Sequence, residues 1–208
     1  MFKLKGVEKT YSYSFTAASM KFLDFMRLVR FIEDYGNHLE DIDPNVIMLR
    51  SNNRTNQREF HELMKRYKLL TENQKELLSQ IDVTGQRQIA MIGICKAYPF
   101  IQDFIIEVVR EKYLSLDFQL TDGDYQTFIN RKLHLHTELE GFSDSTEKKA
   151  RQVVWKMLEE SGIINNTKER HILPQFVDRK VINAILSDDV NLLKIFLMTD
   201  RDIKQLSE

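Results

Sequence analysis

Cysteine, proline and glycine are scarce in this chain of 208 residues, which contains one cysteine, three prolines and seven glycines. A single cysteine, Cys95, excludes an internal disulfide, so the fold makes no use of an oxidising compartment. So few glycines and prolines leave little material for the tight turns of an all-β protein. No apolar run reaches the roughly 18 residues that a membrane-spanning helix needs, and the first residues lack the apolar core of a signal peptide. We therefore expect a mainly helical, cytoplasmic protein.

The charge balance does not by itself indicate a partner. Thirty Lys and Arg residues stand against 31 Asp and Glu, a formal net charge of −1. The 42% of hydrophobic residues, with 13 Phe, 7 Tyr and 8 Met, exclude disorder as the main state, because these side chains need a core. Any case for nucleic-acid binding must therefore rest on local clusters of cations.

Helical periodicity dominates residues 1–118, which we expect to form an N-terminal helical domain. Residues 1–15 alternate loosely and resemble an arm or a short strand. Asp43-Pro44 has the pattern of a helix cap followed by proline at the first position, and Thr71 with Gln74 that of a capping box. The expected helices span residues 16–34, 44–49, 54–70, 72–81, 84–98 and 99–113, and the last two should lie at the centre because they are apolar nearly all round.

Residues 119–208 have a different pattern, which predicts a winged-helix-like C-terminal domain. A helix ending at His134 and a second over 146–161 precede a β-hairpin at 163–174, and two terminal helices follow at 178–186 and 190–199. Helix, turn, helix and hairpin follow one another as in a winged helix-turn-helix. The predicted fold class is therefore mainly α and two-lobed: an N-terminal helical bundle plus a winged-helix-like unit with a short β-hairpin.

The second helix of this unit has one apolar and one basic side. Its cations and those of the hairpin tip are candidate DNA ligands, although a solvated helix face or a protein-docking module would have the same pattern. Trp155 lies near the basic side, where it either docks against the first domain or contacts nucleic acid. The candidate cations of this unit are Lys148, Lys149, Arg151, Lys156, Lys168 and Arg170.

A second cluster of cations follows the helix that begins near Arg54. Arg54, Arg58, His61, Lys65 and Lys68 recur at steps of four, three, four and three residues, so they form one line on the helix, the basic stripe. At about 1.5 Å per residue the line is roughly 21 Å long, and Arg50 precedes it. A stripe of this length can follow a phosphate backbone; the alternative is a solvated helix face.

Patterns of catalytic residues are missing. His134 and His136 have no further ligand nearby, and Asp43, Asp122 and Asp124 are better explained as helix caps. The chain has no glycine-rich phosphate loop, no nucleophile elbow and no paired-carboxylate spacing. We expect neither an enzyme nor a cofactor, metal or small-molecule substrate.

Several segments together resemble the BrxA family of the bacteriophage-exclusion (BREX) defence systems. No single segment is diagnostic, but their order and spacing over about residues 12–176 are specific, whereas residues 178–208 offer little to compare. The matching segments are residues 14–18, Arg50-Ser51 with Arg54, Arg66-Tyr67 with Leu69-Leu70, residues 104–112, residues 120–122, Phe128, residues 145–148, Val153, Met157-Leu158 and residues 162–164.

The resemblance implies an all-helical accessory protein without known catalysis. It would act beside other BREX components, namely a methyltransferase, a large ATPase and a phosphatase-like protein. The family is associated with double-stranded DNA and has been likened to NusB-type RNA-binding factors. We therefore expect a non-catalytic, weakly sequence-selective binder of double-stranded DNA; an RNA-binding factor and a protein–protein assembly adaptor are the alternatives.

Overall fold

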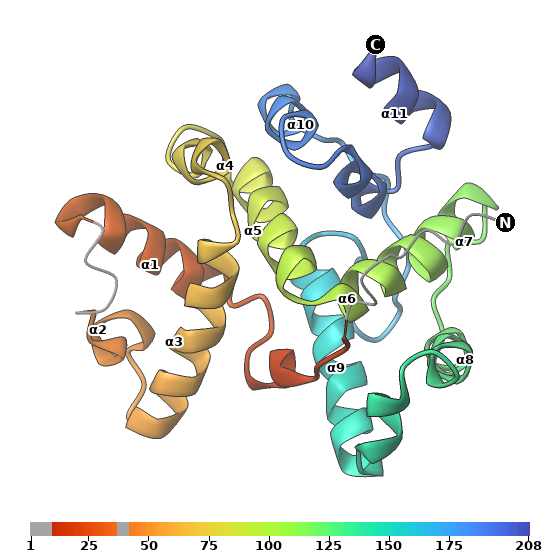
Figure 1. The fold of residues 1–208 in the computed structure, drawn as a ribbon, viewed down its shortest axis with the longest axis horizontal. Helices are drawn as coiled ribbons and strands as arrows, with labels where there is room; N and C mark the ends of the chain where they lie inside the picture. Colours follow the sequence, from red (N-terminus) through yellow and green to blue (C-terminus); the bar gives the residue numbers. More distant parts are fainter. Residues whose placement is uncertain (1–9, 37–41) are drawn as a thin grey trace, which may run out of the picture.

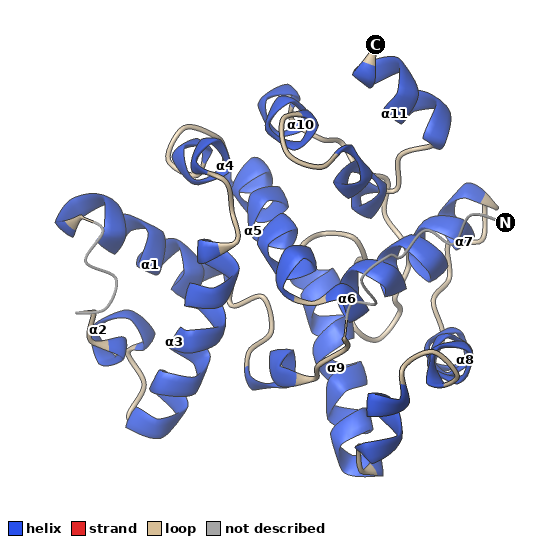
Figure 2. Ribbon diagram, viewed as in Figure 1, coloured by secondary structure: helices blue, strands red, loops and turns tan. Residues whose placement is uncertain are grey.

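The computed structural model describes residues 10–36 and 42–208, and within these ranges the chain is mainly helical, without a β-strand (Figures 1 and 2). Residues 1–9 of the expected arm lie outside the described ranges. The α-helices are α1 (Phe22–Tyr35), α2 (Pro44–Met48), α3 (Asn53–Lys68), α4 (Glu72–Leu77), α5 (Val83–Ala97), α6 (Pro99–Phe104), α7 (Glu111–Leu114), α8 (Asp122–Leu133), α9 (Asp144–Glu160), α10 (Arg179–Leu186) and α11 (Asp200–Ser207). Three 3₁₀ turns, η1 (Ser14–Ala17), η3 (Thr137–Gly141) and η4 (Val190–Phe196), and one π-helical segment, η2 (Ile105–Arg110), complete the described elements.

The apolar helices α5 and α6 form the centre of the fold, as their composition predicts. Residues 88–95 of α5 are all buried, and the chain bends by 113° before Pro99 starts the helical run that continues to Leu114. Proline suits this first helical position because its missing N–H would have no partner there. No single helix among the described residues is long and apolar enough to cross a membrane.

Several expected helix ends are confirmed. Gly36 ends α1 with a φ of 81°, a left-handed value that glycine adopts without strain. The Asp43 carboxylate accepts the N–H of Asn45 at 2.9 Å and caps α2. The capping box of Thr71 and Gln74 is formed at the start of α4.

Other boundaries differ from the expectation. The first helix begins at Phe22 instead of Thr16, because Ser14–Ala17 form a separate 3₁₀ turn and Lys21 adopts a left-handed φ of 51°. The segment expected as a helix over 190–199 is a 3₁₀ helix ending at Phe196, and α11 was not predicted at all.

Pairing in the expected hairpin is limited to isolated bridges. Ile164 pairs with Ile172, and His171 also pairs with Gln119 from the segment before α8. Gly162, with a φ of 77°, ends α9 and turns the chain into this segment. One continuous buried apolar cluster includes residues from both halves of the chain.

The segment from Tyr11 to Met20 runs between α3 and α9 (Figure 1). Its carbonyl groups at Ala18 and Ser19 accept hydrogen bonds of 2.7 and 2.6 Å from the buried guanidinium of Arg66 in α3. On the other side, the Glu160 carboxylate of α9 accepts the N–H of Met20 at 2.8 Å. The segment thereby fixes the relative positions of the two helices that carry the predicted cations.

Candidate nucleic-acid interface

Helix α3 separates its apolar and basic side chains onto different sides. Asn52 caps the helix by accepting the N–H of Thr55 at 3.0 Å. Phe60, Leu63, Met64 and Tyr67 are buried against the core. Every member of the basic stripe, Arg54, Arg58, His61, Lys65 and Lys68, is exposed.

The cations of the stripe are not neutralised within the described part of the chain. Arg54, Arg58, Lys65 and Lys68 form no ion pair there, and the Nζ of Lys65 lies 4.6 Å from the centre of the Tyr98 ring. Unpaired cations on one helix side produce a positive potential that attracts anions from solution. The stripe is therefore an exposed cationic surface.

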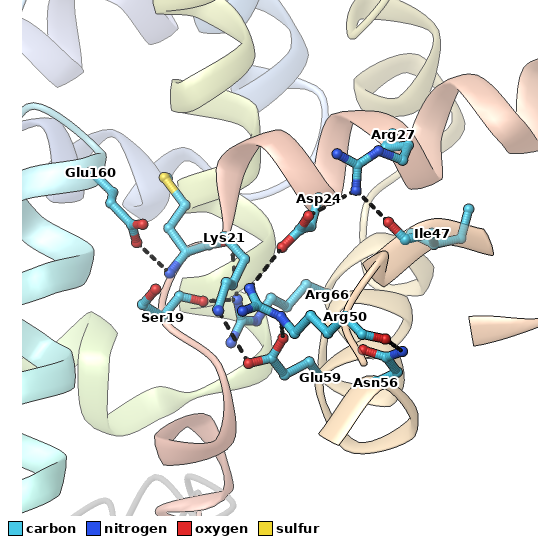
Figure 3. A network of polar contacts seen from close by, with 11 residues as sticks. Ser19, Lys21, Asp24, Arg27, Ile47, Arg50, Asn56, Glu59, Arg66 and Glu160 are labelled. Atoms are coloured by element: carbon cyan, nitrogen blue, oxygen red, sulfur yellow. Dashed lines mark hydrogen bonds and ion pairs between the residues drawn. The ribbon is translucent and has the colours of Figure 1, made fainter. Parts of the chain in front are cut away.

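Two nearby arginines are engaged within the protein. The Arg50 guanidinium pairs with Glu59 at 2.8 Å and with Asp24 at 3.5 Å (Figure 3), so its charge is balanced, unlike those of the stripe. Arg66, which adds to the cation count of this helix in the sequence, is 1% exposed and binds backbone carbonyls. Sequence spacing alone does not show this pairing.

Two residues of the stripe line a cavity together with residues of η1. Arg58 and His61 line it together with Ser14 and Thr16, and its volume is about 390 Å³. Figure 1 shows η1 between α3 and α9, and η1 contacts both helices. The two predicted basic surfaces are thus separated by the hydroxyl-bearing η1.

Trp155 of α9 is a buried packing residue. It is 5% exposed and its ring contacts Phe104 of α6 and Tyr125 of α8, with ring centres 5.6 and 6.0 Å apart. The indole N–H donates to Asp122 at 3.3 Å. Docking onto the core, the first of the two interpretations, is confirmed.

Arg170 does not lie at an exposed tip, contrary to the expectation. Its side chain is 20% exposed and pairs with Asp122 at 2.6 Å, and its guanidinium lies 5.1 Å from the centre of the Trp155 ring. Arg151 approaches the same carboxylate at 3.8 Å. These four residues, Asp122, Arg151, Trp155 and Arg170, form the Asp122 cluster.

The expected capping role of Asp122 is wrong, so its carboxylate is available to pair with Arg170 and Arg151. Thr121 caps α8, and Asp124 completes the capping box with it. Partial burial would raise the pKa of Asp122, but the hydrogen bond from Arg170 and the charges of Arg170 and Arg151 outweigh burial and lower it. Asp122 is thus held in its charged form.

The remaining cations of this unit are Lys148, Lys149, Lys156 and Lys168. All four are exposed, but the Nζ of Lys156 pairs with Glu159 at 2.6 Å. Lys148, Lys149 and Lys168 have no ion pair within residues 10–36 and 42–208. Three of the six predicted cations of this unit are therefore unpaired and three have an acidic neighbour.

His136, one of the two histidines considered as a metal pair, has other contacts. The His136 ring stacks on Tyr11 with centres 3.6 Å apart, and its Nδ1 lies 3.0 Å from Glu138. Among the residues that the structure describes, no group of three or more His, Cys, Asp or Glu side chains could hold a metal ion.

The fold and the surface define a class: a mainly helical protein with an exposed cationic helix beside a second, partly neutralised one. The sequence profile of the BrxA family matches residues 9–189. The chain belongs to the BrxA family.

Individual relatives are distant in sequence. The chain is 24% identical over 131 residues to the BREX protein BrxA of Bacillus cereus (strain H3081.97), a match covering 63% of this chain and 64% of that protein. It is 24% identical over 96 residues to the BREX protein BrxA of Escherichia coli O9:H4 (strain HS), a match covering 46% of this chain and 45% of the relative. The crystal structure of an uncharacterized protein from Magnetospirillum magneticum is similar in fold, with a TM-score of 0.78 at 16% identity, covering 91% of this chain and all of that one.

Proposed function

We propose that this protein is a non-catalytic accessory component of a BREX phage-defence system that binds double-stranded DNA. The observation that carries the proposal is the basic stripe on α3, whose Arg and Lys side chains are exposed and have no ion pair with described residues. Membership of the BrxA family supports the biological setting, and the two curated relatives are named as BREX proteins.

The length of the stripe suits a duplex backbone. At about 3.4 Å of helix rise per nucleotide of one strand, its roughly 21 Å cover about six base pairs. Cations in a line neutralise phosphates and release counterions, which gives affinity without reading bases. Binding is therefore expected to be strongly salt-dependent and weakly sequence-selective.

The α8–α9 unit supplies a second, weaker contact in this proposal. The sequence order of helix, helix and turn resembles that of a winged helix-turn-helix, and isolated bridges join Gln119 with His171 and Ile164 with Ile172 where a wing would lie. In that arrangement α9 is the helix presented to DNA. Lys148, Lys149 and Lys168 are its available cations.

Titrating salt in a binding assay with matched charge variants tests the proposal. The anisotropy of a fluorescein-labelled 20-base-pair duplex is measured with the wild type and with Arg54→Ala/Arg58→Ala/Lys65→Ala/Lys68→Ala. The matched control is Arg179→Ala/Lys180→Ala/Arg201→Ala/Lys204→Ala, which removes four exposed cations from α10 and α11. Loss of affinity and of salt dependence only in the stripe variant supports the proposal.

Other outcomes contradict it. Equal losses in both variants would mean that binding depends only on total charge. Preference for a competing RNA hairpin over the duplex would favour an RNA-binding factor. Wild-type affinity that is weak and insensitive to salt would leave the stripe as a surface for acidic proteins.

A further inference from the structure

A second cavity is lined by cations, and none of the residues of the basic stripe is among the described residues that line it. Its volume is about 660 Å³, and it is formed mainly by the first turns of α1 and α5. Arg50 and Glu160 also line it. The DNA-binding proposal makes no use of this cavity.

The charges of its lining do not cancel. Among the described residues of the lining, five cations, Lys21, Arg27, Arg30, Arg50 and Arg87, accompany two acids, Asp24 and Glu160.

Both acids already have partners inside the protein. The Asp24 carboxylate accepts from Arg27 at 2.9 Å and pairs with Arg50 at 3.5 Å (Figure 3). Glu160 accepts the N–H of Met20, as described above, and Lys21 pairs with Glu59 at 3.1 Å.

Arg30 and Arg87 remain available for an external anion. Both are exposed, and neither has an ion pair with any residue that the structure describes. They come from different helices, α1 and α5, and line the same cavity. A ligand that reaches between these helices therefore meets two unpaired guanidinium groups, which form strong charge-assisted hydrogen bonds to carboxylates.

The cavity also has an apolar part that faces solvent. Leu23 is 75% exposed and Val83 is 54% exposed, and both line it together with Phe22 and Met26. Apolar side chains surrounded by charged ones are typical of protein interaction sites, and arginine with aromatic residues dominates binding energy in such sites. Here the Arg87 guanidinium lies 5.3 Å from the centre of the Phe22 ring.

A duplex backbone does not match this combination, because its phosphates would leave Leu23 and Val83 uncovered. Bases of a single strand stack on exposed aromatic faces, but Phe22 is the one aromatic residue that the structure describes in the lining, and Arg87 lies against it. A polypeptide can supply carboxylates and an apolar side chain at once. We propose that this cavity binds an acidic segment of a partner protein that carries an aliphatic or aromatic anchor residue.

Selection from a peptide library tests this inference independently of DNA binding. Displayed random 12-residue peptides are selected on the immobilised full chain, and an enriched peptide is synthesised with a fluorescein label. We expect enriched sequences with acidic residues on both sides of an apolar one. Their affinity should fall at least about tenfold in Arg30→Glu/Arg87→Glu, since two charge-assisted contacts become repulsive, and should also fall in Leu23→Ser.

The controls separate the possible failures. Arg179→Glu/Arg201→Glu carries the same charge change on other helices and should keep the affinity for the peptide. If Arg30→Glu/Arg87→Glu loses its helical circular dichroism, Arg30→Gln/Arg87→Gln replaces it in the binding assay. Absence of enrichment, enrichment of peptides without acids, or equal binding by the cavity variants would overturn the inference. So would a loss of duplex affinity in Arg30→Glu/Arg87→Glu as large as in the stripe variant, because the cavity would then belong to the DNA surface.

Discussion

Helices α3 and α9 have similar patterns in the sequence but different electrostatics in the structure. On α3, the Arg and Lys side chains of the basic stripe face solvent and form no ion pair among the described residues. On α9 and the turn after it, Arg151 and Arg170 share Asp122, and Lys156 is paired with Glu159. Counting cations along a helix therefore overstates the surface charge wherever distant acids fold against it.

The difference assigns separate roles to the two regions. The Asp122 cluster connects α8, α9 and the turn before Ile172, with Trp155 beneath Arg170. Its arginines stabilise the unit, whereas Arg54 and Arg58 of the stripe have no ion pair among the residues that the structure describes. Substitutions in the cluster should thus act first on folding, and substitutions in the stripe on binding.

Replacing Trp155 with alanine should produce the largest effect. The change removes a buried indole that contacts Phe104 and Tyr125, which typically costs about 3–5 kcal/mol. A lower melting temperature measured by circular dichroism checks the prediction. Trp155→Phe is the matched control, and its melting temperature should fall less because most of the packing remains. A normal melting temperature of Trp155→Ala would contradict the packing role.

Single alanine substitutions along the stripe should have the second-largest effect. They should weaken duplex binding and leave folding unchanged. Each of Arg54→Ala, Arg58→Ala, Lys65→Ala and Lys68→Ala should reduce the slope of log affinity against log salt by about one. Unfolding free energy should change by less than about 0.5 kcal/mol, as for most surface substitutions. Salt titrations with two unrelated duplexes check this, and a loss confined to one duplex would indicate base reading instead.

Asp122→Asn should change duplex affinity less than the stripe substitutions do, and it should raise the affinity instead of lowering it. It releases Arg151 and Arg170 from their shared acid, so duplex affinity should rise if α9 contacts DNA. The unfolding free energy should fall by less than about 1 kcal/mol, because Asp122 is half exposed and solvent screens the pair. Unchanged affinity would exclude this side of α9 from the DNA surface.

The stability difference between Asp122→Asn and the wild type should also depend on pH. The pKa of Asp122 is lowered in the folded protein, so its charge stabilises the fold above the unfolded pKa of about 3.9. This contribution is lost as pH falls through the lower folded pKa. Chemical unfolding of both proteins should therefore show a difference in unfolding free energy at pH 7, and this difference should disappear below about pH 4.

Lys168→Glu should produce the smallest effect and distinguish the two cations of the turn. Lys168 is exposed and unpaired in the described part of the chain, so its reversal should leave the melting temperature unchanged and slightly weaken duplex binding. Arg170→Glu, the matched substitution, should lower the melting temperature because it places a second carboxylate beside Asp122. Equal melting temperatures of the two variants would contradict the cluster.

Local signals in the sequence predict the helical fold well. The caps at Asp43 and Thr71 and the stop at Gly36 depend on neighbouring residues, and each is where the sequence indicates. Residues 163–173 pair only through isolated bridges. Helix α11 was missed although its cap, Thr199 with Asp202 three residues later, is a local signal of the same kind.

Long-range partners are what the sequence does not reveal. Arg66 and Arg170 look like surface cations, yet one binds carbonyls 47 and 48 residues earlier and the other an acid 48 residues earlier. The unpaired arginines of the α1–α5 cavity, Arg30 and Arg87, were missed because nothing in the sequence brings their helices together. The stripe was found because its residues share one helix.

The segment between α3 and α9 has a consequence for synthesis on the ribosome. The N–H of Tyr11 bonds to Glu138 and that of Met20 to Glu160, partners that lie 127 and 140 residues further along the chain. At about 5–20 residues per second, Met20 leaves the peptidyl-transferase centre roughly 7–28 s before Glu160 is made. The segment from Tyr11 to Met20 is therefore translated before these two partners and reaches its final place only after they are made.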